Sequence, residues 1–128
     1  MAIKYKVIQK TQPGVVGGGV KKYYASIAIK GVITVEDLAK KIEKFSSLSE
    51  PDIYGVIIAL ENVIQLELAD CNIVRLKELG TLYPTISSEG RDEAEKVDAG
   101  CIKGVGVNYR PGARTLAGLK TAGFKKSV

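Results

Sequence analysis

The sequence predicts an α+β protein in which an N-terminal β-hairpin precedes two helices, a second β-hairpin with a long arm, and a C-terminal helix. Three observations carry this prediction. Apolar residues alternate with basic residues near the N-terminus, a capped pattern with helical spacing covers residues 34–69, and strand-like apolar segments return after residue 72. We therefore divide the chain into a strand extension (1–33), a main domain (34–124) and a basic tail (125–128).

Two N-terminal segments have the composition of paired β-strands. Residues 3–7 alternate apolar and basic side chains, and residues 23–29 are rich in aromatic and β-branched side chains. Pro13-Gly14 and the triplet Gly17–Gly19 lie between them and are typical of a flexible connection that is longer than a two-residue hairpin. The triplet lacks the Lys-Ser/Thr that follows in a phosphate-binding P-loop, so we expect a loop there and no nucleotide site.

Residues 34–69 predict two helices. Thr34 and Asp37 are typical of a helix N-cap with an acidic first turn, and apolar residues then recur at helical spacing as far as Phe45. Residues 46–49 are rich in serine and end this helix. Ser49-Glu50-Pro51-Asp52 begins a second one, because proline is tolerated in a first turn, and it continues to about Ala69.

The second helix is apolar on almost every side, with a thin polar strip at Glu61, Asn62 and Gln65. Such a helix needs partners on several faces. A second copy of the chain would provide them, which predicts a homodimer. The alternative is a central helix that is wrapped by its own sheet.

The remaining third of the chain predicts strands, an arm and a last helix. Residues 73–79 and 81–86 predict two strands joined near Gly80, and Pro84 places the second one at an edge or a bulge. Residues 87–100 are polar, with either a short helix or a mobile tip at 91–98. Residues 102–109 predict a strand, and Pro111-Gly112 begins the last helix, which carries Leu116 and Leu119.

The basic residues are concentrated at the two ends of the sequence. Residues 1–33 hold six lysines and residues 103–128 hold six basic residues, and neither segment contains an acid. In a folded protein this distribution can form a positive face that suits a polyanion, or the ends can simply be solvated. Cys71 and Cys101 lack metal-ligand spacing and predict two reduced thiols.

The composition argues against an enzyme. The chain has no histidine, which is the commonest general base and a frequent metal ligand. Neither cysteine has a recognisable activating partner, and Gly104-Val105-Gly106 lacks the third glycine of a dinucleotide fingerprint. We expect no catalytic residue, cofactor or metal site, and no small-molecule substrate. No membrane span or secretory leader is visible, so a cytoplasmic protein is expected.

Two short motifs resemble those of the HU/IHF family of bacterial histone-like proteins. Leu79-Gly80-Thr81-Leu82, entered from the hairpin strand Arg75-Leu76-Lys77, is similar to the family's Gly-Phe-Gly-Thr-Phe turn. Asn108-Tyr109-Arg110-Pro111-Gly112 is similar to the Phe-Lys-Pro-Gly segment before the family's last helix. With the two preceding helices, the resemblance covers about residues 34–124. The chain resembles an extended, divergent HU-like variant of the kind found in Bacteroides-type bacteria.

The resemblance implies an intertwined homodimer whose β-arms surround double-stranded DNA over a saddle of strands, as in a nucleoid-associated architectural protein. Glycine allows close backbone approach, and a helix N-terminus beside arginines can bind phosphate. Two weaker candidates, Arg91 and Lys103, come from the arm. The predicted DNA-binding residues are Arg75, Lys77, Gly80, Thr81, Arg91, Lys103, Arg110, Gly112 and Arg114.

The arm departs from the family pattern. The family's arm tip carries an Arg-Asn-Pro motif with a proline wedge, whereas residues 87–101 contain no proline and carry acids at 92, 93, 95 and 98. Two alternatives therefore stay open. The chain could be a protein-interaction or structural module with weak or no DNA binding, or Tyr23 and Tyr24 could stack on RNA bases. If DNA is the ligand, we expect contacts mostly to phosphates and little sequence preference.

Overall fold

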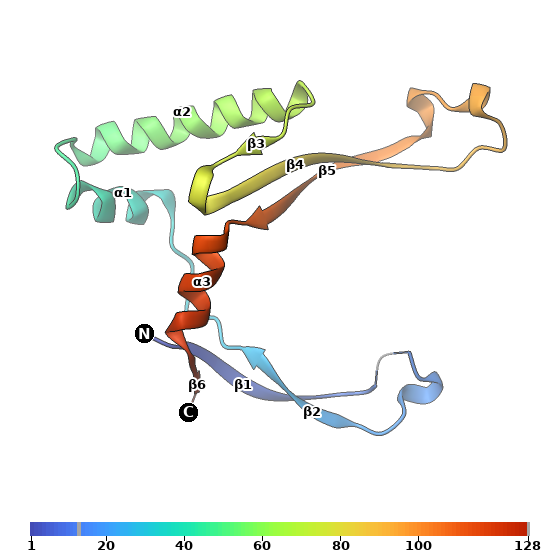
Figure 1. The fold of residues 1–128 in the computed structure, drawn as a ribbon, viewed down its shortest axis with the longest axis horizontal. Helices are drawn as coiled ribbons and strands as arrows, with labels where there is room; N and C mark the ends of the chain where they lie inside the picture. The colour runs from blue at the N-terminus through green and yellow to red at the C-terminus, as the bar shows by residue number, and fades with distance from the viewer. Residues whose placement is uncertain (13, 128) are drawn as a thin grey trace. The chain divides into compact units, whose positions relative to one another are not determined.

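The structure is a computed structural model that describes residues 1–12 and 14–127. The chain forms two compact units (Figure 1). The terminal unit comprises Met1–Val32 and Leu116–Val128, and the central unit comprises Ile33–Thr115. Three α-helices and two three-stranded sheets make up a mixed α+β fold, as the sequence predicts.

A three-stranded sheet with the order β2-β1-β6 forms the terminal unit. β1 (Ile3–Lys10) pairs antiparallel with β2 (Lys22–Ile27) and parallel with β6 (Phe124–Lys126). The connection between β1 and β2 contains a short 3₁₀ turn, Val16–Gly18. Pro13, which the sequence places in this connection, lies outside the described residues.

β6 is a strand that the sequence does not predict. Residues 125–128 are expected to be a basic tail, but Lys125 and Lys126 pair with β1, and the backbone N–H of Ser127 donates to the carbonyl of Tyr5 at 2.8 Å. The sequence prediction misses β6 because its pairing partner is distant in the chain. β6 pairs with the edge of β1 that β2 does not occupy, and more than a hundred residues separate the two strands. Val128 lies outside the described residues.

The helices of the central unit begin where their capping residues predict. α1 (Val35–Glu43) has Thr34 as N-cap, with a reciprocal capping box between Thr34 and Asp37. α2 (Glu50–Ala69) has Ser49 as N-cap and proline in its first turn. Both predicted helices are confirmed because their signals are local and strong.

The second sheet has the order β3-β4-β5 and is antiparallel throughout. β4 (Gly80–Ser88) and β5 (Ile102–Pro111) are long, but β3 contains only Val74–Arg75. The strand predicted for residues 73–79 is therefore too long. Lys77 has a φ of 49°, and a 3₁₀ turn over Lys77–Leu79 replaces the end of that strand.

Pro84 lies in the part of β4 that has a single neighbouring strand. β3 pairs only with Thr81 and Leu82, whereas Pro84 is opposite Val107 of β5. Pro84 has no backbone N–H to donate, and at this position β4 has a neighbouring strand on one side only. The proline therefore interrupts no central hydrogen-bond ladder, as the sequence predicts for an edge position.

The tip of the arm is held by two 3₁₀ turns, Ala94–Lys96 and Ala99–Cys101. Asp98 accepts a hydrogen bond from the backbone N–H of Gly100 at 3.0 Å. The Cys101 side chain is buried, with its Sγ 3.7 Å from the carbonyl oxygen of Lys96. Local turns thus form at the tip, and Cys101 fills the small space inside them.

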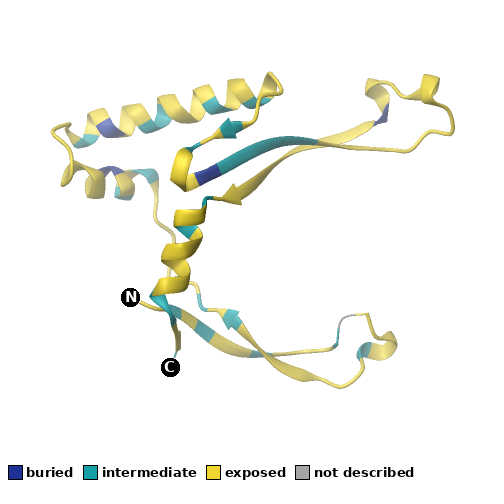
Figure 2. Ribbon diagram, viewed as in Figure 1, coloured by how far each residue is buried: buried dark blue, intermediate teal, exposed yellow. Residues whose placement is uncertain are grey.

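Few apolar residues of either unit are buried (Figure 2). Across residues 1–12 and 14–127, the buried hydrophobic side chains are Ala39, Ile53 and Cys101. α2 keeps Leu60 at 49% and Leu66 at 69% exposure, so the alternative that its own sheet wraps this helix is wrong.

Candidate nucleic-acid interface

The register of the β3-β4-β5 sheet brings three predicted site residues into one row. Arg75 of β3 is directly opposite Thr81 of β4, and Thr81 is directly opposite Arg110 of β5. Side chains of directly opposed residues project from the same face, and adjacent strands lie about 4.8 Å apart. Arg75 and Arg110 are both exposed. The row therefore presents the hydroxyl of Thr81 with one guanidinium group on each side, that of Arg75 and that of Arg110.

The same face continues along the arm with polar and small residues. The Arg110 guanidinium lies over the Tyr83 ring, 5.1 Å from its centroid. This contact holds the planar guanidinium against an aromatic surface. Because side chains alternate along a strand, the face also includes the cross-strand pairs that follow. These are Tyr83 with Asn108, Thr85 with Gly106, and Ser87 with Gly104.

Six residues of this face are absent from the sequence-based site: Tyr83, Thr85, Ser87, Gly104, Gly106 and Asn108. The sequence contains their signal as an alternation of glycine and asparagine with valine and tyrosine along residues 104–109. This alternation identifies a polar face only when the partner strand and its register are known. The glycines leave the backbone of β5 open to close approach on that face.

Gly80 and Gly112 have a packing role in the structure. Gly80 has a φ of 138°, and a side chain there would collide with the Arg110 carbonyl and the Tyr109 ring. A side chain at Gly112 would collide with the Glu78 backbone. These contacts are sufficient to explain both glycines without a contact to phosphate.

The start of α3 (Ala113–Ala122) is held against the turn before β4. The Thr115 hydroxyl donates to the Glu78 carbonyl at 2.7 Å, and the Tyr109 hydroxyl donates to the Leu79 carbonyl at 2.6 Å. Arg114 is exposed on the first turn of this helix, one residue before the end of the central unit. Lys77 is exposed on the 3₁₀ turn.

The two weaker candidates lie away from the row. Arg91 is at the arm tip, where its guanidinium forms an ion pair with Glu89 at 2.7 Å. Lys103 is exposed beside the irregularity in the pairing of Ser87 and Ser88 with β5. The structure does not bring either residue to Arg75, Thr81 and Arg110.

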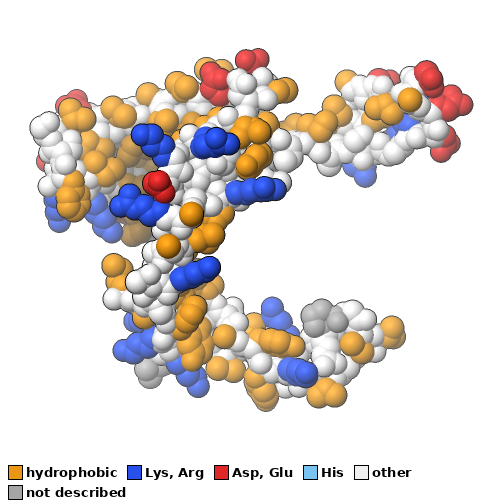
Figure 3. Space-filling model, viewed as in Figure 1, with side chains coloured by type: hydrophobic (Ala, Val, Ile, Leu, Met, Phe, Trp, Pro, Cys, Tyr) orange, Lys and Arg blue, Asp and Glu red, His pale blue; other side chains and the backbone are white. Residues whose placement is uncertain are grey.

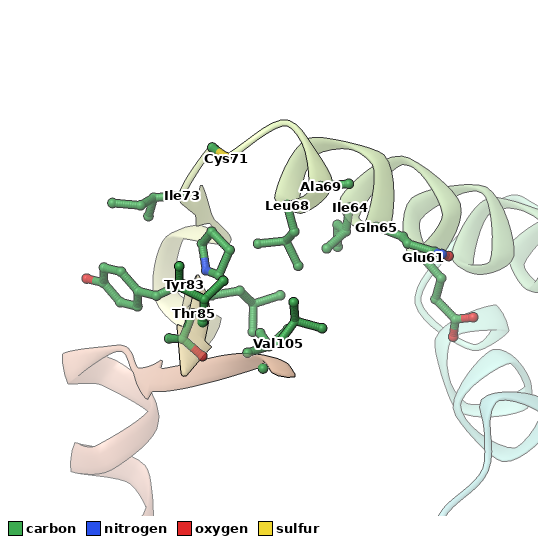
Figure 4. Close-up of a pocket in the computed structure, with 15 residues that line it drawn as sticks. Glu61, Ile64, Gln65, Leu68, Ala69, Cys71, Ile73, Tyr83, Thr85 and Val105 are labelled. Atoms are coloured by element: carbon green, nitrogen blue, oxygen red, sulfur yellow. The ribbon is translucent and has the colours of Figure 1, made fainter. Parts of the chain in front are cut away.

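The opposite face of the sheet is apolar and forms an open groove with the C-terminal half of α2 (Figure 4). Ile64 and Leu68 of α2 point toward the strands, and Val105 lies on the strand side. The groove has a volume of about 1120 Å³ and also contains Leu82, Ile86 and Val107.

The charge of the two units differs in sign. The central unit holds ten Lys or Arg residues and fourteen Asp or Glu residues. The terminal unit holds nine lysines and no acid. Figure 3 shows acidic side chains at the arm tip and only basic ones on the strands of the terminal unit in this view. The proposed row is thus a local basic feature within an acidic unit.

The sequence matches the HU-HIG family, described as an HU domain fused to wHTH, Ig or glycine-rich motif, over residues 1–126. The chain belongs to this family. The resemblance to HU proteins inferred from the two motifs is therefore confirmed, and the match includes the N-terminal 33 residues.

A solved structure from Bacteroides vulgatus ATCC 8482, described as a candidate bacterial DNA-binding protein, has the same fold. It shares 12% sequence identity with this HU-HIG chain, with a TM-score of 0.70, over 98% of this chain and 48% of that chain. The chain thus spans about half the length of that protein. No curated protein matches the sequence. Within the described residues, no helix is long and apolar enough to cross a membrane.

Proposed function

We propose that this HU-HIG protein binds double-stranded DNA with little sequence preference, as a dimeric, non-catalytic architectural component of the nucleoid. The observation that carries the proposal is the row of Arg75, Thr81 and Arg110 on the exposed face of the β3-β4-β5 sheet. Arginine guanidinium groups bind phosphate oxygens with two parallel hydrogen bonds. Among the described residues, none of the helices α1, α2 and α3 resembles a major-groove reader, so we assign the contacts to the DNA backbone.

The dimer is the second part of the proposal. The groove against α2 and the exposed Leu60 and Leu66 leave apolar surface that a second copy can cover. A homodimer would cover this apolar surface without another partner.

The arm has a limited role in the proposal. Its tip carries acids at 92, 93, 95 and 98 and no proline in residues 87–101. Carboxylates repel phosphates, and Arg91 is already paired with Glu89. We therefore assign phosphate contacts to the base of the arm, and no insertion between base pairs to its tip.

The test is DNA binding across a salt series. The wild type and an Arg75→Ala/Arg110→Ala variant, which lacks both arginines of the row, are titrated with a random-sequence duplex between 50 and 200 mM salt. Loss of two phosphate contacts should flatten the slope of log K against log salt by about 1.8. A Lys40→Ala/Lys41→Ala variant, which removes the same charge from α1, should keep the wild-type slope.

Two results would contradict the proposal. Equal slopes for the arginine variant and the wild type would exclude the row as the site. Failure of the wild type to bind duplex DNA even at 50 mM salt would exclude DNA binding, and the interpretation as a protein-interaction module would replace it.

A further inference from the structure

The terminal unit has a sheet with two chemically different faces. Side chains alternate along a strand, and directly opposed residues share a face. The pairings of Lys6 with Ser26 and Ile8 with Tyr24 place these residues on one side of the sheet. The opposite side carries mostly apolar and aromatic residues, among them Ile3, Val7, Ile27 and Phe124. Five lysines project from the first side, which we call the lysine face: Lys4, Lys6, Lys10, Lys22 and Lys125.

The lysine face places like charges directly opposite each other twice. Lys10 of β1 is paired with Lys22 of β2, and Lys4 of β1 is paired with Lys125 of β6. Like charges directly opposite each other destabilise a sheet. All four residues are exposed. The arrangement is unfavourable in the free protein and becomes favourable when an anion lies across the face.

The unit itself supplies no such anion. It contains nine lysines and no Asp or Glu. Among the residues that the structure describes, both ion pairs, Arg91–Glu89 and Lys96–Glu93, are in the arm of the central unit. An external polyanion is therefore the partner that this face fits by charge.

We propose that the lysine face of the β2-β1-β6 sheet is a second DNA-binding surface, which holds duplex phosphates independently of the Arg75–Thr81–Arg110 row. This inference rests on the proposed DNA-binding function and adds the source of its electrostatic affinity. Lys4 and Lys6 are two positions apart on one strand, a separation of about 6.8 Å. Several ammonium groups can therefore contact one phosphate backbone together.

Two other polyanions fit the face less well. Insertion into an anionic membrane needs apolar side chains beside the basic ones, but Ile3, Val7 and Phe124 are on the opposite face. Single-stranded nucleic acid needs a series of stacking aromatics, and the lysine face contains only Tyr24 in the described strands. Duplex DNA needs charge and a regular surface alone.

The experiment compares two variants with the same net charge. Lys4→Gln/Lys6→Gln/Lys125→Gln removes three lysines from the face. Lys30→Gln/Lys120→Gln/Lys126→Gln removes three lysines of the same unit that lie outside it, since Lys126 is paired with Tyr5 on the apolar side. Both full-length variants are titrated with the same duplex and salt series as the wild type, after circular dichroism shows that their folds are intact.

The face variant should lose about 2.7 from the salt slope, which corresponds to three phosphate contacts. The control variant should change by much less. An equal loss in both variants would overturn the proposal, because overall charge would then explain the effect. A wild-type slope in the face variant would also overturn it. An Arg75→Ala/Arg110→Ala variant that still loses affinity in that case leaves the proposed function intact.

The two proposals also fail separately in the remaining cases. If the face variant loses slope and the arginine variant does not, the lysine face stands and the row is not the site. If the face variant loses binding to phosphatidylserine vesicles and keeps duplex binding, the face serves membranes and the DNA proposal for it is overturned. If the wild type binds no duplex, both proposals are overturned.

Discussion

The two sheets of this protein have three strands each, but the units to which they belong have net charges of opposite sign. The β2-β1-β6 sheet belongs to a unit with nine lysines and no acid, whereas the β3-β4-β5 sheet belongs to a unit in which acids exceed bases by four. The first sheet presents repeated point charges. The second presents two arginines placed by register around Thr81. For the proposed DNA binding, the unit with the larger positive charge is therefore not the unit that carries the arginine row.

The apolar faces of the two sheets differ as well. In the central unit, the apolar face and α2 form a groove of about 1120 Å³, whereas the groove on the apolar face of the terminal sheet measures about 290 Å³. The difference predicts that oligomerisation depends on the central unit.

The largest effect is expected from a charge placed in the larger groove. Leu68 is half-buried and points toward the strands. Leu68→Glu should weaken a homodimer at least 100-fold, about 2.7 kcal/mol, because a carboxylate would be buried without a partner. Sedimentation equilibrium measures this change. Val16→Glu, at a fully exposed position of the terminal unit, is the control and should leave the mass unchanged. A wild type that is monomeric at micromolar concentration would contradict the dimer.

The next effect concerns the turn that places the arginine row. Gly80→Ala should destabilise the protein by about 1–3 kcal/mol, because alanine tolerates a φ of 138° poorly and its Cβ would meet Arg110 and Tyr109. Urea unfolding measures the loss. Gly118→Ala is the matched control: no atom lies within 4 Å of its added Cβ, and alanine favours a helix by about 1 kcal/mol. Equal effects of both substitutions would show that Gly80 has no special conformation.

The same turn shows how far the sequence could predict the fold. Helices α1 and α2 follow from local signals, and the structure shows Thr34 and Ser49 as their N-caps. The strand predicted for residues 73–79 fails because Lys77 adopts a positive φ that no apolar pattern reveals. Strand β6 is missed because its partner, Ile3–Tyr5, lies at the other end of the chain.

The candidate sites depend on long-range pairing in the same way. Arg75, Thr81 and Arg110 can be selected from two short motifs, but their common row requires the register of three strands. The lysine face is only half visible in the alternation of residues 3–7, since Lys22 and Lys125 join it through two different neighbours. Arg91 and Lys103 have suitable charge and lie elsewhere. The type of each residue can be read from the sequence, whereas the face that the residues share depends on the pairing of distant strands.

A smaller effect is expected from the cap of α1, where Asp37 is one of the acids of the central unit. Asp37 receives hydrogen bonds from the backbone N–H and the hydroxyl of Thr34, which lower the pKa of its carboxyl group; Lys40 and Lys41 lower it further. Acids at helix N-termini therefore stabilise this unit. Thr34→Ala should cost about 1 kcal/mol at neutral pH in urea unfolding.

The pH dependence of that loss has a defined sign. A carboxyl group with a lowered pKa in the folded state adds stability above its unfolded pKa, and this stability is lost as the pH falls through the folded pKa. The difference between wild type and Thr34→Ala should therefore narrow below about pH 4. A difference that is constant from pH 7 to pH 2 would show that the carboxylate of Asp37 is not part of the cap.

The smallest effect is expected in the terminal sheet and has the opposite sign. Lys10→Glu converts the Lys10–Lys22 pair into an attractive one and should stabilise the protein by about 0.2–1 kcal/mol, measured by thermal unfolding at low salt. The gain should fade at 1 M salt, where screening is strong. Lys126→Glu, opposite Tyr5, makes the same charge change without such a pair and should gain less. If Lys10→Glu also weakens duplex binding, the residue that lowers fold stability is the one that raises affinity, as expected for a surface selected to bind an anion.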